Sequence, residues 1–276
     1  MLSKIRKIPR GSLEYLRKLG ISPTANDRSI RRLKGIHEGL HAVIVGNGPS
    51  LTIADLDRVS DQLSFGSNRV FLAFEKTRWR PTYYSVFDLL VAKNNAREIK
   101  ELRLPKLLSN LVHPYLSMVD DALWIHEMRN NGKAFAIEPP DFHQQPAPAF
   151  SKDAHVGVES GSTVVFSQMQ IAYFMGIKHI TLLGIDFQFE VRGKLVSTGI
   201  AEQKEALVSV GEANHFHPDY RRMGDIWGVP RMVDQHRAFQ KAKLEFERVG
   251  GSIVNASRKT ALNVFPLMKL EDALSR

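Results

Sequence analysis

Short apolar runs alternate with helical patterns along most of the chain. Strands are predicted where the apolar runs occur, at residues 42–45, 64–67, 82–87, 106–109, 123–125, 134–137, 179–184 and 253–255. Helices are predicted between several of them, at residues 53–59, 89–102, 162–175 and 233–249. Strands that alternate with helices join into a parallel sheet through right-handed crossovers. The pattern therefore predicts an α/β, Rossmann-like fold with a mostly parallel sheet and flanking helices.

Two segments depart from this alternation. In residues 1–40, leucine and isoleucine recur among cations at roughly helical spacing, and Gly20, Pro23 and Asn26 interrupt them. We therefore expect an N-terminal basic amphipathic arm of two short helices at 1–40, followed by one nucleotide-binding domain at 41–276. Residues from about 188 to 230 are polar and irregular. They are predicted to form a lid over the carboxyl edge of the sheet.

The net charge of +9 lies mainly in the arm. Residues 1–41 hold ten Lys and Arg against three Asp and Glu, whereas the rest of the chain holds 28 against 26. A general nucleic-acid-binding protein is expected to carry more positive charge on its folded body, so we predict no nucleic-acid partner. A basic amphipathic arm instead fits an anionic membrane surface.

Composition narrows the chemistry further. The chain has no Cys, which removes disulfides, thiolate metal sites and cysteine nucleophiles, and fits a reducing compartment. It contains no apolar run of about 18 residues and no secretory signal pattern at its start. We therefore expect a cytoplasmic protein, peripheral to the inner face of the membrane.

The first predicted strand ends in Gly46-Asn47-Gly48-Pro49-Ser50. Open parallel sheets bind ligands at the carboxyl ends of their strands, beside helix N-termini whose free amides attract anions. Gly46 and Gly48 allow close approach to the backbone, Asn47 offers a donor and an acceptor, and Ser50 is expected to cap the next helix. The segment is neither a dinucleotide-binding fingerprint nor a P-loop, so a different nucleotide or phosphate site is predicted.

Further polar residues follow the later strands at the same predicted edge. Asn68 comes after the second strand, Asp88 after the third, and Asp186 after the strand at 179–184. Ser160-Gly161-Ser162 opens the helix predicted at 162–175 with small hydroxylated residues, which suit a second anion cradle. The predicted nucleotide site therefore combines Gly46, Asn47, Gly48, Ser50, Asn68, Asp88, Ser160, Gly161, Ser162 and Asp186.

The lid contains the remaining candidate residues. His215 and His217 are two residues apart with an Asp and a Tyr nearby, but no metal site is predicted there. We expect one of these two histidines to act as a general base, with Tyr220 as a further catalytic residue. Arg221 and Arg222 are expected to stabilise a phosphate group.

These motifs resemble two related groups of enzymes over roughly residues 41–265. The shared residues are VIVGNGPSL at 43–51, SGST at 160–163 and LLGIDF at 182–187. One group is the bacterial sialyltransferases that use CMP-sialic acid to extend lipooligosaccharide. The other is the MptE-like family, named for the archaeal 6-hydroxymethylpterin diphosphokinase.

The sialyltransferase resemblance implies that Asn47, Asn68 and Ser160-Gly161-Ser162 hold the nucleotide, with Asp186 at its edge. Asp88 stands where those enzymes have an asparagine. They also have an arginine just before the small-residue helix start, and a tyrosine pair that steadies the leaving phosphate. Here the segment 156–159 holds no arginine, and Tyr220 is the nearest tyrosine.

The leading prediction from this resemblance is a glycosyltransferase. It would move a sugar, sialic-acid-like or other, from a CMP-linked donor to a cell-surface glycan or lipid-linked acceptor, with no required cofactor. One alternative is a Mg²⁺-dependent diphosphokinase that uses ATP and a pterin-like alcohol, with Asp88 and Asp186 as metal ligands. Another is a non-catalytic nucleotide-binding protein of an envelope glycan pathway.

Overall fold

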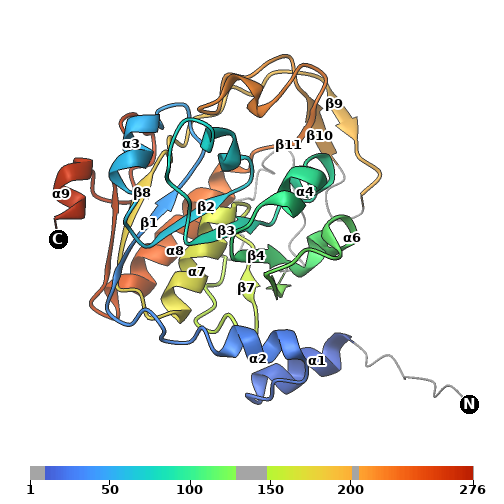
Figure 1. The fold of residues 1–276 in the computed structure, drawn as a ribbon, viewed down its shortest axis with the longest axis vertical. Helices are drawn as coiled ribbons and strands as arrows, with labels where there is room; N and C mark the ends of the chain where they lie inside the picture. The colour runs from blue at the N-terminus through green and yellow to red at the C-terminus, as the bar shows by residue number, and fades with distance from the viewer. Residues whose placement is uncertain (1–9, 129–147, 201–204, 276) are drawn as a thin grey trace, which may run out of the picture.

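The central sheet has seven parallel strands in the order β12-β8-β1-β2-β3-β4-β5 (Figure 1). The structure is a computed structural model that describes residues 10–128, 148–200 and 205–275. The sheet strands are β1 (His41–Val45), β2 (Ser64–Ser67), β3 (Tyr83–Val86), β4 (Lys106–Ser109), β5 (Ala122–Ile125), β8 (His179–Leu183) and β12 (Ser252–Asn255). The predicted α/β, Rossmann-like class is confirmed. The strand predicted at 134–137 lies outside the described residues.

Helices cover both faces of the sheet, and the alternation of side chains along β1 shows why. Ala42 and Ile44 belong to one apolar cluster, which includes residues of α7 (Val164–Phe174) and α8 (Met232–Glu247). Val43 and Val45 belong to a second cluster on the opposite face. Its helices are α3 (Ile53–Arg58), α4 (Leu89–Asn94), α5 (Ala96–Glu101), α6 (His113–Leu116) and α9 (Leu270–Leu274). A strand buried on both faces reads as a continuous apolar run, which is why its position was predictable.

Strand order reverses between β1 and β8. From β1 the chain adds β2, β3, β4 and β5 in turn on one side, and it then returns to place β8 and β12 on the other. Ligands of open α/β sheets bind in the crevice outside such a reversal point, at the carboxyl ends of the strands. The glycine turn after β1 and Asp186 after β8 therefore lie at this position.

Several predicted helix boundaries were wrong for local reasons. The helix predicted at 89–102 is divided into α4 and α5 at Asn95, whose side-chain Nδ2 donates to the Val91 carbonyl at 2.9 Å. The helix predicted from residue 162 begins at Val164, because Ser162 has a left-handed φ of 58° and Thr163 is the N-cap. Ser50 does not cap α3, whose N-cap is Thr52 in a capping box with Asp55.

The segment expected to be an irregular lid contains a small antiparallel sheet, so that part of the prediction was wrong. Its strands are β9 (Leu195–Ser197), β10 (Glu205–Val208) and β11 (Ile226–Gly228), with β10 in the middle. The segment does lie at the carboxyl edge. The Phe216 amide donates to the Asn47 carbonyl at 3.0 Å, and Arg69 Nη1 donates to the Tyr220 carbonyl at 2.6 Å.

The arm forms two helices, α1 (Arg10–Lys18) and α2 (Ala25–Arg31). Gly20 turns the chain between them with a φ of 76°. Asn26 does not break the arm as expected. It lies within α2, and its side chain bonds both the N–H and the carbonyl of Trp124 on β5, at 2.8 and 2.9 Å. The arm thus packs against the edge strand of the sheet.

A few short elements complete the described chain. A two-stranded parallel sheet joins β6 (Glu127–Met128) to β7 (Val158–Glu159). Single 3₁₀ turns occur at η1 (Val70–Ala73), η2 (Asn110–Val112) and η4 (Pro218–Tyr220). In the described part of the chain, every helix is too short or too polar to cross a bilayer.

Candidate functional site

The glycine turn after β1 packs directly against the turn after β8. The Gly48 amide donates to the Gly184 carbonyl at 2.9 Å, and the Ser50 amide donates to Asp186 Oδ2 at 2.7 Å. The Ser50 hydroxyl also donates to Asp186 Oδ1. A Cβ atom built on Gly48 would lie 2.7 Å from Asp186 Cγ, closer than real Cβ contacts allow. The glycines therefore let the two turns touch, and the amide expected to bind a ligand holds a carboxylate of the protein.

Neither carboxylate proposed for Mg²⁺ is free of protein contacts. Asp186 is only 4% exposed, and burial raises its pKa although the Ser50 hydrogen bonds lower it in part. Asp88 is the N-cap of α4, where its Oδ1 accepts from the amides of Leu90 and Val91 at 2.8 and 3.0 Å. Within the residues that the structure describes, no group of three or more His, Cys, Asp or Glu side chains is placed to hold a metal ion.

Buried acceptor atoms without partners surround the carboxyl end of β2. Asn47 Nδ2 donates to the Ser67 carbonyl at 3.2 Å, and Gln168 Nε2 of α7 donates to the Gly66 carbonyl at 3.0 Å. These bonds leave Asn47 Oδ1 and Gln168 Oε1 with no hydrogen-bond partner among the described residues. The Oδ1 of Asn68 and the Oγ of Ser85 are likewise buried and unpartnered in the described part of the chain.

An unpaired buried polar atom costs about 1–3 kcal/mol, so native proteins rarely leave several together. Here Asn68 and Ser85 are neighbours across β2 and β3, since the Asn68 amide donates to the Ser85 carbonyl at 3.0 Å, and Asn47 and Gln168 donate to β2 carbonyls. Asn68 also has a left-handed φ of 53°, a conformation that is uncommon outside glycine. A cluster of free acceptors beside a strained residue is typical of a binding site.

The small-residue segment before α7 is used mainly for packing. A Cβ on Gly161 would lie 2.4 Å from Phe166 Cδ1 and 2.7 Å from Ala238 Cβ, so the glycine lets α7 and α8 approach. The Ser160 amide donates to the Met128 carbonyl at 3.2 Å. Ser162 accepts at its carbonyl from Gln235 Nε2 at 3.0 Å. Any role of this segment in nucleotide binding stays a prediction.

In the lid, His215 is held by a carboxylate that the sequence prediction missed. Its Nδ1 lies 3.0 Å from Glu212 Oε1, and its ring stacks on the Tyr220 ring with centroids 3.7 Å apart. Because a carboxylate can only accept, Nδ1 carries the proton and Nε2 of the neutral ring is left as the basic nitrogen. Burial lowers the pKa of His215 to about 4, against the opposing effect of Glu212.

His217 has the opposite arrangement. Its Nδ1 accepts from the Asp219 amide at 3.2 Å, as the cap of η4, so the proton of its neutral ring lies on Nε2. A nitrogen that already carries a proton cannot accept another. The hydrogen bonds therefore favour His215 over His217 as the base, a choice that the sequence left open.

The two predicted phosphate-binding arginines are placed differently. Arg221 lies over the Trp227 ring, 3.4 Å from its centroid, and burial lowers its pKa to about 10. It lines a small pocket of about 110 Å³ together with Glu212. Arg222 is exposed, and its amide closes a turn onto Asp225 at 2.8 Å. Arg69, which the sequence prediction omitted, links β2 to the lid through the Tyr220 carbonyl.

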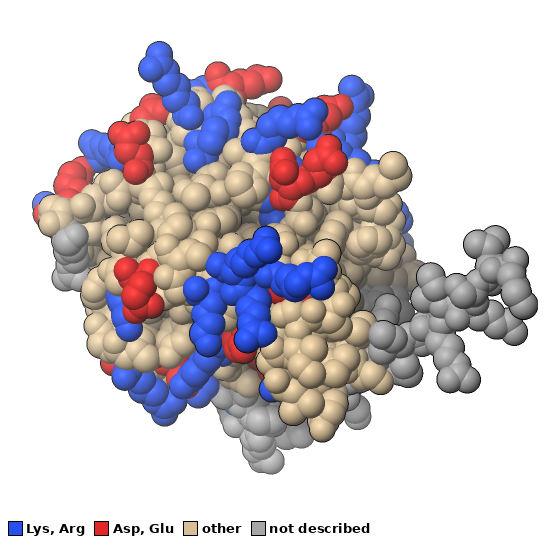
Figure 2. Space-filling view, turned by 60° about the horizontal axis from the view of Figure 1, so that its bottom comes forward, with Lys and Arg blue, Asp and Glu red and all other residues tan. Residues whose placement is uncertain are grey.

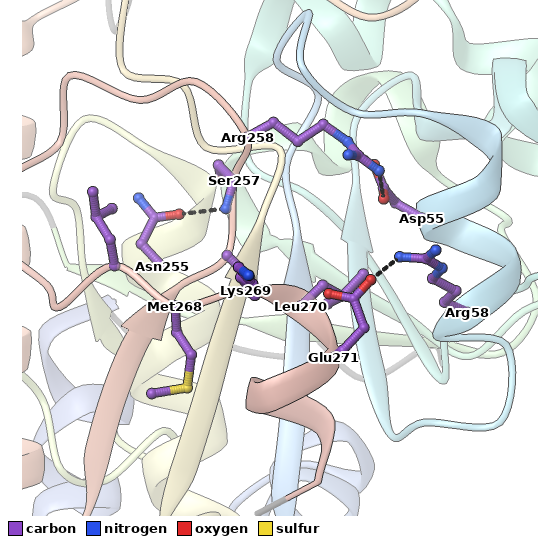
Figure 3. Close-up of a pocket in the computed structure, with 11 residues that line it drawn as sticks. Asp55, Arg58, Asn255, Ser257, Arg258, Met268, Lys269, Leu270 and Glu271 are labelled. Atoms are coloured by element: carbon purple, nitrogen blue, oxygen red, sulfur yellow. Dashed lines mark hydrogen bonds and ion pairs between the residues drawn. The ribbon is translucent and has the colours of Figure 1, made fainter.

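A larger pocket of about 500 Å³ lies elsewhere, between α3, α9 and the end of β12 (Figure 3). Four of the charged side chains that line it are paired with one another. Arg258 binds both carboxylate oxygens of Asp55, and Arg58 pairs with Glu271. None of the predicted site residues lines this pocket.

The structure thus brings together Asn47, Asn68, Ser50 and Asp186 at the carboxyl edge of the sheet, and the segment around Tyr220 is bonded to this edge through Arg69. Sequence reasoning missed Ser85, Gln168, Glu212 and Arg69. Ser85 lies two residues before the end of a predicted strand, and Glu212 lies three residues before His215. These two positions were the only sequence signals for any of the four residues. The fold defines a Rossmann-like α/β protein in which a small lid segment contacts the polar carboxyl edge of the sheet.

Comparisons with known proteins add a distant fold likeness. No protein-family model matches the chain, and no curated protein matches it. Among solved structures, the chain is similar to that of the MAf glycosyltransferase from Magnetospirillum magneticum AMB-1, with 12% identity and a TM-score of 0.46. The match covers 89% of this chain and 38% of that one. Similarity at this level says nothing about substrate or reaction.

Proposed function

We propose that this protein is a glycosyltransferase that takes a sugar from a nucleotide donor at the crevice between β1, β2 and β8. The observation that carries the proposal is the group of unpartnered acceptors: Asn47 Oδ1, Asn68 Oδ1, Ser85 Oγ and Gln168 Oε1. The three amide oxygens can only accept and the Ser85 hydroxyl can accept or donate, so the group calls for a ligand that brings hydrogen-bond donors. The hydroxyl groups of a ribose meet this requirement, and so does an exocyclic amine of a base.

The same chemistry supports a CMP-linked donor. Cytosine presents an amine donor where uracil presents an oxygen acceptor, and Asn47 Nδ2 and Gln168 Nε2 are both already committed to backbone carbonyls. The oxygens of these amides have no partner among the described residues and could accept from the cytosine amine. The sequence resemblance to sialyltransferases that use CMP-sialic acid points to the same nucleotide.

Transfer would proceed by displacement at the anomeric carbon. The acceptor hydroxyl oxygen forms the new bond to this carbon as the bond to the phosphate oxygen breaks. His215 Nε2 takes the hydroxyl proton, and Glu212 holds the ring by its Nδ1 at 3.0 Å. CMP leaves as a phosphate anion, whose charge Arg69 and Arg221 would stabilise. A sialic-acid-like sugar and a cell-surface glycan acceptor complete the proposal.

Nucleotide binding tests the crevice first. Thermal shift should show that CMP, without Mg²⁺, stabilises the protein more than UDP, GDP or ATP, since a ligand at 100 times its Kd adds about 2.7 kcal/mol. Asn68→Gly keeps the left-handed backbone but removes the acceptor, and should weaken CMP binding about tenfold. Asp121→Gly is the matched control, because Asp121 also has a left-handed φ, 55°, but lies at the other end of the sheet beside Lys106. Its CMP affinity should equal that of the unchanged protein.

Two results would overturn parts of the proposal. Stabilisation only by ATP with Mg²⁺ would favour the diphosphokinase alternative. CMP binding with no release of CMP from any CMP-sugar, in the presence of glycan acceptors, would favour a non-catalytic nucleotide-binding protein.

A further inference from the structure

The inner face of the arm is fixed to the body of the protein. Asp27 is 1% exposed, and its Oδ1 accepts from Arg17 Nε at 2.9 Å. Ser22 Oγ lies 2.9 Å from Nε2 of His155, and Ile30 is 2% exposed within the main apolar cluster. These contacts set the orientation of α1 and α2. The outer face of the arm is therefore a defined surface.

Four cations share that outer face. Arg28, Arg31 and Arg32 recur at helical spacings of three and four on the part of α2 left in solvent when Asp27 and Ile30 are buried. Lys34 follows them, and all four are exposed. The acids nearest in the sequence have other partners: the buried Asp27 pairs with Arg17, Glu38 lies 3.9 Å from Lys178, and Glu14 pairs with Lys18. The four cations therefore project a net positive charge.

Exposed apolar side chains adjoin these cations. Tyr15 is 63% exposed, Leu19 57% and Ile21 46%. Arg31 Nη1 donates to the carbonyl of Gly20, which lies between Leu19 and Ile21. The charged group and the apolar group are thus parts of one surface. Figure 2 looks toward the end of the molecule that carries the arm and shows Lys and Arg side chains gathered near its centre.

We propose that this surface, formed by Tyr15, Leu19, Ile21, Arg28, Arg31, Arg32 and Lys34, docks on an anionic lipid bilayer. Cations attract the negative headgroups, and exposed apolar side chains can enter the boundary between headgroups and acyl chains. Nucleic acid is a poorer fit, because Tyr15 is the single aromatic side chain of this surface available for stacking.

This docking also sets the direction of the crevice. Figure 1 shows α1 and α2 at one end of the molecule, and β9, β10 and β11 at the other. A protein bound through the arm therefore turns its carboxyl-edge crevice away from the bilayer. If the proposed transferase function holds, its acceptor is the distal end of an extended glycan and not a group at the lipid surface.

Vesicle binding tests the docking without any nucleotide or sugar, so its result is independent of the transferase proposal. The full-length protein should sediment with vesicles containing phosphatidylglycerol, more strongly at 50 mM than at 500 mM salt, and poorly with phosphatidylcholine alone. At roughly fivefold per cation, replacing Arg28, Arg31, Arg32 and Lys34 by Gln should lower the partition coefficient about 100-fold or more. Replacing Tyr15, Leu19 and Ile21 by Ser should weaken the part of vesicle binding that persists at 500 mM salt.

A matched control removes the same charge from another face. Lys93, Arg97, Lys100 and Arg103 are four exposed cations on and beside α4 and α5. Their replacement by Gln should leave vesicle binding nearly unchanged. Equal losses in the two fourfold variants, or equal binding to phosphatidylglycerol and phosphatidylcholine vesicles, would overturn the proposal. The proposal would also be overturned if the protein bound neither kind of vesicle but bound a heparin column through the arm cations.

Discussion

The protonation of His215 gives the sharpest test of the lid. Burial lowers the pKa of His215 to about 4, from the ordinary histidine value of 6.5. In the unfolded chain the same imidazole titrates at its ordinary value. Between these two pH values the unfolded state therefore binds more protons than the folded state. The free energy of unfolding must then fall as the pH falls through this window.

The size of the effect follows from the two pKa values. For one group with these values, the free energy of unfolding falls by about 2 kcal/mol between pH 7.5 and pH 5.0. The pKa of Glu212 is raised by burial but lowered more by its hydrogen bonds, so it titrates below its ordinary value of 4.5 and adds little above pH 5. Burial also lowers the pKa values of His37 and His155, which add slopes of the same sign. The contribution of His215 must therefore be measured as a difference.

Replacing His215 by Gln isolates that difference, because the amide can still donate to Glu212 but has no titration. Urea denaturation of both proteins at pH 7.5, 6.0 and 5.0 gives their free energies of unfolding. The unchanged protein should lose about 2 kcal/mol more than H215Q over this range. Parallel curves, within about 0.5 kcal/mol, would show that His215 is not the buried neutral group inferred here.

Three further predictions follow from other parts of the structure. Glu212→Gln should lower kcat for sugar transfer about tenfold or more with the donor KM unchanged, because the imidazolium that forms at His215 loses its partner charge; steady-state kinetics checks this. Gly48→Ala should lower the free energy of unfolding by about 1–3 kcal/mol in urea, since its Cβ would lie 2.7 Å from Asp186 Cγ. The adjacent exposed Pro49 should tolerate Ala with little change. Replacing Arg28, Arg31, Arg32 and Lys34 by Gln should leave kcat within about twofold of the unchanged value when the assay contains a soluble glycan acceptor and no vesicles.

The sheet was predictable because its strands are buried on both faces. Ser64–Ser67 and Lys106–Ser109 were predicted with their observed bounds, and the other central strands in the described chain differ by one or two residues. The lid strands were not predictable in the same way. They are only three or four residues long, and their pairing of Leu207 with Leu195 and Trp227 depends on contacts across the lid. No local pattern distinguishes such segments from polar loops.

The side chains of the site were predictable as residue types but not as roles. Asn47 and Asn68 follow parallel strands, so the sheet alone brings them to one edge. The choice between His215 and His217 depends on which ring nitrogen has a protein partner. That partner is Glu212 for one histidine and the backbone of Asp219 for the other. Sequence spacing cannot distinguish these cases, because both partners lie within three residues.

The glycine turn shows how one motif supports two physical explanations. In the sequence, Gly46 and Gly48 were expected to admit a ligand, whereas in the structure they admit the turn that carries Asp186. Since the Ser50 amide is occupied by Asp186, the anionic part of a bound nucleotide needs other partners. The guanidinium groups at the lid, Arg69 and Arg221, carry the charge for this. Phosphate recognition would then depend on the lid, while the base and ribose would be recognised by the sheet edge beneath it.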